Sequence, residues 1–177
     1  VFGGKIATDH YVTNQMWLLT TGDTPTWSDR SPSAGSSAPC GLEGHAALYD
    51  AAHHCMLVLG GGAFLGPCDG IQPSFWSLAI PSFEWTRLTF ANPAPHARVN
   101  ATAVLDTRRN CVVLYGGQGS LNGGACNADT WELPLEPDAS WRLVAPEREI
   151  PDFGVYARAS YDTFHDRMVV YDGSIVW

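Results

Sequence analysis

The sequence contains no apolar run close to the roughly 20 residues that a helix needs to cross a bilayer. It also has no stretch of eight or more residues with a 3.6-residue hydrophobic period, which argues against any long helix. Basic residues are scarce, with 10 Lys and Arg against 18 Asp and Glu and a net charge of −8. This balance argues against a nucleic-acid backbone or an anionic membrane surface as a partner.

Signatures of catalytic and cofactor-binding sites are missing as well. There is no Gly-x-Ser-x-Gly, no Cys-x-x-Cys and no phosphate-binding Gly-rich loop before a helix. The six histidines lack the spacing of a zinc site with cysteines. We therefore expect no metal and no cofactor, and we assign no catalytic residue.

The residues that are abundant favour a globular all-β protein. The 177-residue chain is 45% hydrophobic and carries seven tryptophans, enough for one domain with a substantial core. Its 18 glycines and 12 prolines are typical of many short strands joined by many turns.

A short apolar run ending in two glycines recurs along the chain. Residues 111–117 read Cys-Val-Val-Leu-Tyr-Gly-Gly, residues 55–61 read Cys-Met-Leu-Val-Leu-Gly-Gly, and residues 167–173 read Arg-Met-Val-Val-Tyr-Asp-Gly. The last glycines of these runs, and of an opening Val-Phe-Gly-Gly, lie 57, 56 and 56 residues apart, at Gly4, Gly61, Gly117 and Gly173. Such a regular period predicts a repeat architecture.

Three further strands complete each repeat. A strand ending in aspartate precedes the Gly-Gly run, at Asp50, Asp106 and Asp162. Two tryptophan-bearing strands follow it. The tryptophan pairs are Trp17 with Trp27, Trp76 with Trp85, and Trp131 with Trp141. Four short antiparallel strands per repeat are typical of a β-propeller blade.

These motifs resemble the kelch family of repeats over essentially the whole chain. The similarity rests on the Gly-Gly pair, the Tyr-Asp ends at residues 49–50 and 161–162, the paired tryptophans, and Asn-Ala-Asp-Thr-Trp-Glu-Leu at residues 127–133. Two positions depart from the pattern: Asp172 replaces the first glycine of the last pair, and Leu105 replaces the aromatic residue before Asp106. The resemblance implies a propeller of four-stranded antiparallel blades.

The repeats divide the chain into parts of four blades. We expect the outer strands of a first blade in residues 1–31 and a second blade in residues 44–89. A third blade is expected in residues 100–145, and the inner strands of a further blade in residues 156–173. Propellers need about 4–8 blades to close. The chain is therefore predicted to be part of a larger propeller or to form a homo-oligomer, such as a dimeric six-blade ring.

Most of the repeated residues have a structural interpretation. The aspartates are placed to accept hydrogen bonds from backbone NH groups in hairpin turns. The glycine pair provides backbone angles that a side chain would forbid, and the tryptophans provide apolar area for packing between blades. We expect Trp85 and Trp141 to be core residues.

Loop length differs strongly between the two predicted faces. The connections between the first and second strands, and between the third and fourth, are short. Those between the second and third strands (residues 5–15, 62–74 and 118–129) and between blades (residues 31–43, 90–99 and 146–155) are long. Long loops on a rigid scaffold are where binding usually occurs. The candidate binding residues on these loops are His10, Tyr11, Phe64, His96, Arg98, Asn122, Asn127, Phe153, Tyr156 and Arg158.

The function predicted from these features is a non-catalytic scaffold that binds a protein or peptide through the long-loop face. The alternative is a carbohydrate-active or metal-dependent enzyme with its site on the same face. Some kelch-type proteins are copper-dependent galactose oxidases, but their copper ligands have no residue-by-residue match in this chain.

The five cysteines form two groups. Cys55 and Cys111 begin equivalent strands and are expected to be buried free thiols. Cys40, Cys68 and Cys126 lie in long loops, where a single disulfide is one alternative. The odd number and the lack of a compact framework favour a reducing, intracellular compartment.

Overall fold

The computed structural model describes residues 1–6, 11–63, 70–71, 74–91, 93–119, 126–144 and 156–171 of the chain. These residues form strands, turns and irregular connections without a helix, so none of them provides a helix that could span a membrane. The strands are β1 (Trp17–Thr20), β2 (Thr26–Asp29), β3 (Ala46–Asp50), β4 (Cys55–Leu59), β5 (Gly62–Ala63), β6 (Gly70–Ile71), β7 (Phe75–Ala79), β8 (Trp85–Arg87), β9 (Thr102–Asp106), β10 (Cys111–Tyr115), β11 (Thr130–Pro134), β12 (Arg142–Val144), β13 (Arg158–Asp162) and β14 (Arg167–Tyr171).

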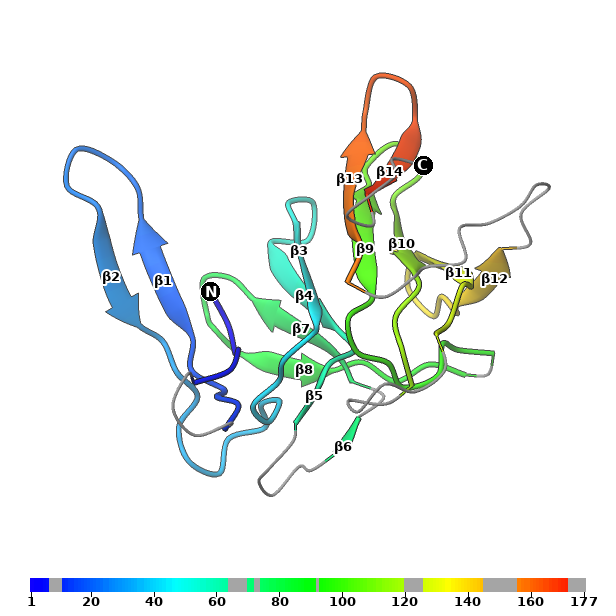
Figure 1. The fold of residues 1–177 in the computed structure, drawn as a ribbon. Helices are drawn as coiled ribbons and strands as arrows, with labels where there is room; N and C mark the ends of the chain where they lie inside the picture. Colours follow the sequence, from blue (N-terminus) through cyan, green and yellow to red (C-terminus); the bar gives the residue numbers. More distant parts are fainter. Residues whose placement is uncertain are drawn as a thin grey trace.

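The strands assemble into antiparallel sheets that follow the chain (Figure 1). The second blade has the order β3-β4-β7-β8, and the third blade has the equivalent order β9-β10-β11-β12. Hairpin β1–β2 represents the outer half of a first blade, and hairpin β13–β14 represents the inner half of a fourth. The short hairpin β5–β6 lies in the long connection between β4 and β7. The all-β, four-stranded antiparallel organisation predicted from the repeat is confirmed, as part of a propeller.

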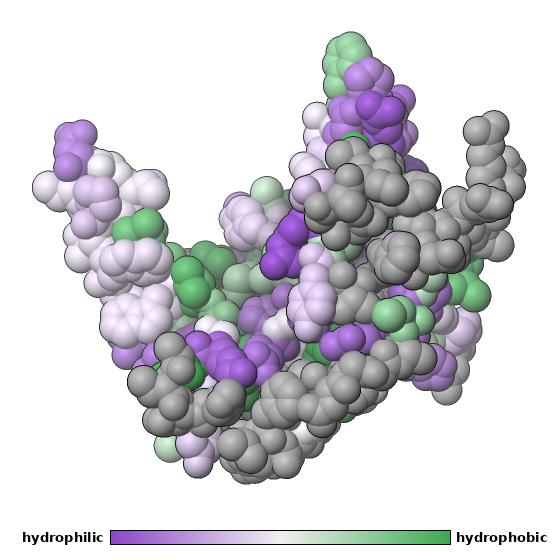
Figure 2. Space-filling view, in the orientation of Figure 1, coloured by the Kyte–Doolittle hydropathy of each residue, from purple (hydrophilic) through white to green (hydrophobic). Residues whose placement is uncertain are grey.

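The first strand of each repeat lies innermost. Strand β9 contacts both β3 and β13, so the three equivalent strands stand side by side. The blades fan outward from this row, and the surface between hairpins β1–β2 and β13–β14 is broadly hollowed (Figure 2). Equivalent residues at the same end of the three inner strands are therefore close together in space.

Each inner strand ends in an aspartate that organises the following turn. Asp50 Oδ1 accepts hydrogen bonds from the backbone NH groups of Ala52 and His53, at 3.0 and 3.2 Å. Asp106 and Asp162 make the same pair of contacts in their own turns. Each turn then closes on a residue with positive φ, such as His54 at 49°. The predicted structural role of these aspartates is confirmed.

The first two glycine pairs join their blade to the next one. Gly60 has a φ of 69°, and a Cβ there would lie 2.7 Å from the backbone oxygen of Arg98. Gly61 donates its NH to that same oxygen at 2.9 Å. Gly3 and Gly4 repeat both features against the backbone oxygen of Leu42. The first glycine is required by close backbone approach as well as by its φ.

The core is continuous across the blade junctions. Trp141 is 2% exposed and packs on Phe75 and Phe90 of the preceding blade, with ring centroids 5.3 and 6.0 Å apart. Trp85 is half-buried and packs on Phe2 at 4.8 Å. Both tryptophans therefore take part in packing between blades, as expected from the sequence.

The cysteines also divide into two groups in the structure. Cys55 and Cys111 are buried and free, as predicted. Cys126 is free and exposed, whereas Cys40 is disulfide-bonded. One of the loop cysteines, Cys40, is therefore part of a disulfide.

Candidate binding site at the inner strands

Three residues separated by 56 positions meet where the long loops enter the inner strands. Gly44, Asn100 and Tyr156 have positive φ values of 64°, 57° and 62°. The NH of Asn100 donates to the oxygen of Gly44 at 2.7 Å, and the NH of Tyr156 donates to the oxygen of Asn100 at 3.3 Å. These two backbone hydrogen bonds thus link three blades around the propeller axis. A Cβ at position 44 would lie 2.6 Å from Asn100 Oδ1, so a side chain there would displace the Asn100 amide.

These residues border a pocket of about 500 Å³ between the inner strands. Much of its lining consists of small side chains, namely Ala46, Ala47, Ala101, Ala103 and Ala157. Its polar and aromatic lining consists of His45, Asn100, Thr102, Tyr156 and Arg158. Tyr156 is 64% exposed, and Arg158 is also exposed. The pocket therefore opens to solvent beside an aromatic ring and a guanidinium group.

The guanidinium of Arg158 is not neutralised by a described neighbour. Its Nη1 makes only long hydrogen bonds, at 3.4 and 3.3 Å, to the backbone oxygens of Tyr156 and Ala157. No carboxylate among the described residues pairs with it. In a chain of net charge −8, this pocket presents a positive group to an incoming ligand.

His45 forms the side of the pocket that faces the first blade. Burial lowers the pKa of His45, and a hydrogen bond to the backbone carbonyl of Leu42 opposes that change. Its Nδ1 atom is buried and has no hydrogen-bond partner among the described residues. The imidazole packs edge-on against Phe2, with ring centroids 5.6 Å apart. His45 is therefore a neutral ring at pH 7.

Among the described residues, two of the predicted binding residues come together in this pocket, Tyr156 and Arg158. Tyr11 is exposed on the first long loop, and His96 is exposed beside a separate hollow near Phe75 and Phe90. Asn127 is half-buried, and its NH donates to the oxygen of Gly117 at 2.8 Å. Four candidates lie outside the described residues: His10, Phe64, Asn122 and Phe153.

Arg98 differs from the expectation of a surface residue, because it is only 2% exposed. Its guanidinium donates to both carboxylate oxygens of Asp129, at 2.6 and 3.1 Å, and to the backbone oxygen of Gly116 at 2.8 Å. Asp129 also accepts a hydrogen bond from Trp131 Nε1 at 2.6 Å. These contacts assign Arg98 to the connection between the second and third blades.

Four residues of the pocket did not stand out in the sequence: Gly44, His45, Asn100 and Thr102. The signal that could have found them is the 56-residue spacing of Gly44, Asn100 and Tyr156, which equals that of the aspartates. Gly44, Asn100 and Tyr156 have different side chains and share only a backbone conformation with positive φ.

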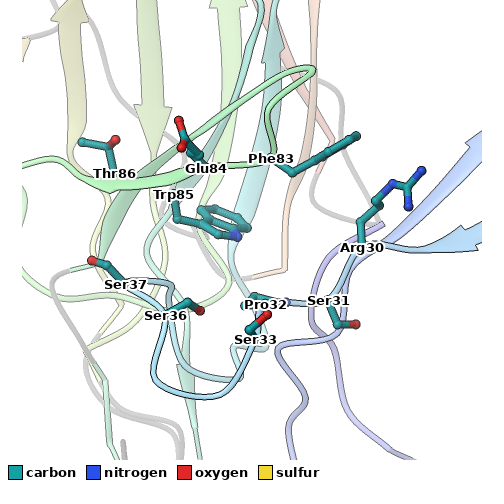
Figure 3. A pocket seen from close by; sticks show the side chains of 10 residues that line it. All are labelled: Arg30, Ser31, Pro32, Ser33, Ser36, Ser37, Phe83, Glu84, Trp85 and Thr86. Atoms are coloured by element: carbon teal, nitrogen blue, oxygen red, sulfur yellow. The ribbon is translucent and has the colours of Figure 1, made fainter.

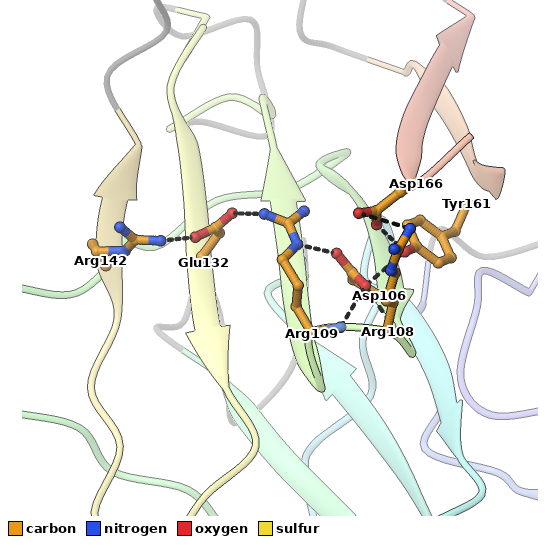
Figure 4. Close-up of polar contacts among 7 residues, drawn as sticks. All are labelled: Asp106, Arg108, Arg109, Glu132, Arg142, Tyr161 and Asp166. Atoms are coloured by element: carbon orange, nitrogen blue, oxygen red, sulfur yellow. Dashed lines mark hydrogen bonds and ion pairs between the residues drawn. The ribbon is translucent and has the colours of Figure 1, made fainter. Parts of the chain in front are cut away.

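The short-turn face is the face of the propeller that carries the turns after Asp50, Asp106 and Asp162. On this face, a series of paired charged groups crosses the third blade (Figure 4). Glu132 pairs with Arg142 on one side and with Arg109 at 3.1 Å on the other. Arg109 Nε lies 2.5 Å from the buried carboxylate of Asp106. Burial raises the pKa of Asp106, but hydrogen bonds from Arg109 and Tyr161 outweigh it and lower the pKa overall.

Tyr161 extends this series into the fourth blade. Its hydroxyl lies 2.6 Å from Asp166 Oδ1 and 2.7 Å from Asp106 Oδ1. Hydrogen bonding to Asp166, with burial and Asp106, raises the pKa of Tyr161. A hydroxyl carries one proton, so it donates to one carboxylate at a time. Every charged or hydroxyl group in this series has a partner within the protein. We therefore assign the series a structural role, which is to join the third blade to the fourth.

Among the residues that the structure describes, no group of three or more His, Cys, Asp or Glu side chains could hold a metal ion.

The blade order, the inner-strand row and the glycine junctions define a kelch-type β-propeller architecture. A family model described as the KLHDC2/KLHL20/DRC7 Kelch-repeats domain matches residues 1–174. The chain belongs to this kelch-repeat family. A search of curated proteins gave no significant match.

Proposed function

We propose that this chain is a non-catalytic binding module that recognises a protein or peptide at the inner end of its long-loop face. Kelch propellers commonly bind proteins, and this chain shares their repeat. The observation that carries the proposal is the pocket between the inner strands, where exposed Tyr156 and Arg158 lie together. An aromatic ring beside an arginine is a combination enriched at contact hot spots.

The charge of the pocket indicates the kind of peptide. Arg158 has no carboxylate partner among the described residues, so an acidic side chain of the ligand would pair with it without competition from them. His45 is neutral and adds no charge at pH 7. The proposed ligand is therefore a peptide segment with at least one acidic residue next to a group that packs on Tyr156.

A selection with random peptides on the full chain tests the proposal. Peptides recovered by phage display are synthesised, and their affinity is measured by titration calorimetry. We expect them to be enriched in Asp or Glu. Tyr156→Ala and Arg158→Glu are expected to weaken binding at least tenfold, about 1.4 kcal/mol, with little change in melting temperature.

Arg108→Ala is the matched control, because Arg108 is an exposed arginine on the short-turn face. It should leave the affinity unchanged. Peptides that bind the Tyr156 and Arg158 variants as tightly as the original chain would place binding elsewhere and overturn the proposal.

A further inference from the structure

A second hollow lies at the outer rim, between the first and second blades (Figure 3). Its volume is about 590 Å³. One wall is the loop that follows β2, with Arg30, Pro32 and serines 31, 33, 36 and 37; the other is residues 83–86 of the second blade. Figure 3 shows the indole of Trp85 between Phe83 and the serine-rich loop. This hollow shares no lining residue with the pocket at the inner strands.

The junction between the second and third blades shows which residue holds the equivalent position there. Arg30 and Leu88 are equivalent, because their NH groups donate to the equivalent residues Met16 and Phe75, each at 2.8 Å. Two positions further along, Pro32 in the first blade therefore corresponds to Phe90 in the second.

The two equivalent tryptophans have different surroundings for this reason. Trp141 packs edge-to-face against Phe90, with centroids 6.0 Å apart and planes at 77°, and it is 2% exposed. Trp85 has no such ring on that side, because Pro32 and the small serines replace it, and it remains half-buried. At the second junction Phe90 of the chain itself thus packs beside Trp141, whereas Pro32 holds the equivalent position at the first junction.

Two charged side chains of opposite sign line the hollow, Arg30 and Glu84, and Arg30 is the group that can receive a carboxylate. The guanidinium carbon of Arg30 lies 5.5 Å from the ring centroid of Phe83, and the side chain is exposed. Arg30 forms no ion pair with a carboxylate of another described residue. A ligand with a carboxylate beside its aromatic ring would therefore find a partner at this rim.

We propose that this hollow is a docking site for an aromatic side chain of a partner peptide, with an adjacent acidic residue bound by Arg30. The ring packs edge-to-face on Trp85, as Phe90 does on Trp141. This site is separate from the pocket of the proposed function, so either can fail without the other.

The test uses two synthetic peptides, Ac-Asp-Phe-Gly-NH2 and Ac-Asp-Ala-Gly-NH2, added to the full chain. Binding is followed by NMR through the indole NH signal of Trp85, assigned by its loss in Trp85→Phe. We expect a saturable shift of this signal with the phenylalanine peptide and none with the alanine peptide. Arg30→Ala should weaken the interaction severalfold, and Tyr156→Ala should leave it unchanged.

Pro32→Phe provides the sharpest variant, because it places in the first blade the ring that the second blade already has. We expect it to raise the melting temperature and to weaken the phenylalanine peptide at least tenfold. Should Pro32→Phe not fold, the comparison of the two peptides on the original chain still decides. Equal shifts with both peptides, or no shift with either, would overturn the proposal, as would undiminished binding to a folded Pro32→Phe.

Discussion

The guanidinium of Arg98 and the carboxylate of Asp129 form a two-point contact, at 2.6 and 3.1 Å, between segments 31 residues apart. The contact joins the loop that leaves the second blade to the loop that enters β11. The backbone oxygen of Arg98 also accepts the NH of Gly61. One buried arginine therefore connects the ends of β4, β10 and β11.

We predict that breaking this pair lowers stability without a specific effect on ligand binding. Asp129→Ala leaves a cation that is 2% exposed without its partner, so a loss of about 3–5 kcal/mol is expected in chemical denaturation. Arg142→Ala is the control, since its side chain is 73% exposed and should cost about 1 kcal/mol or less. Similar losses for both variants would show that burial does not set the strength of the pair.

Three tryptophans occupy equivalent positions in or directly before the fourth strands, and they should differ in their contribution to stability. Trp141 is 2% exposed, so Trp141→Ala should cost about 3–5 kcal/mol. Trp27 is 52% exposed and its replacement should cost about 1 kcal/mol, with half-buried Trp85 between them. Denaturant midpoints of the three alanine variants measure this order. A cost at Trp27 equal to that at Trp141 would contradict it.

The period of 56 residues was enough to predict the strands, the aspartate turns and the glycine pairs. These features repeat because every blade meets the same local requirements: a turn acceptor and close backbone approach. Leu105 in place of the aromatic residue did not disturb the period, because Asp106 still accepts both NH groups of its turn.

The site was predictable only in part, because it depends on contacts between repeats. Loop length indicated Tyr156 and Arg158, which the structure brings to one pocket. It also indicated Arg98, whose burial is decided by Asp129 in the next blade and leaves no local signal. The hollow beside Trp85 arises from Pro32 in place of an aromatic residue, which becomes visible only when the strand register is known.

Acidification should destabilise the junction between the first two blades through His45. Because burial lowers the folded-state pKa of His45, the unfolded chain binds a proton more readily. Stability is therefore fully retained above the ordinary histidine pKa of about 6.5 and falls as pH decreases below it.

His45→Ala isolates this contribution, since Ala101 and Ala157 occupy the same position in the next two repeats. Melting temperatures measured from pH 7.5 to 5 should fall less steeply for this variant than for the original chain. Parallel curves would mean that His45 does not contribute to the pH dependence.

The free edges of the first and fourth blades predict that the isolated 177-residue chain associates. Within the described residues each of these blades has only two strands, and Trp27 and Tyr171 are 52% and 47% exposed along them. Unpaired edges with exposed apolar groups promote association. Sedimentation should therefore show species larger than the 19.1 kDa monomer.

The form of association distinguishes the two arrangements expected from the repeat. A six-blade dimer would place β14 of one copy beside β1 of the other. That position is already partly occupied by the first residues of the same chain. Phe2 forms a β-bridge with Met16, and the NH of Trp17 donates to the oxygen of Val1 at 2.8 Å. We therefore expect heterogeneous association rather than a discrete dimer. A single dimeric species would favour strand exchange, and a stable monomer would refute association altogether.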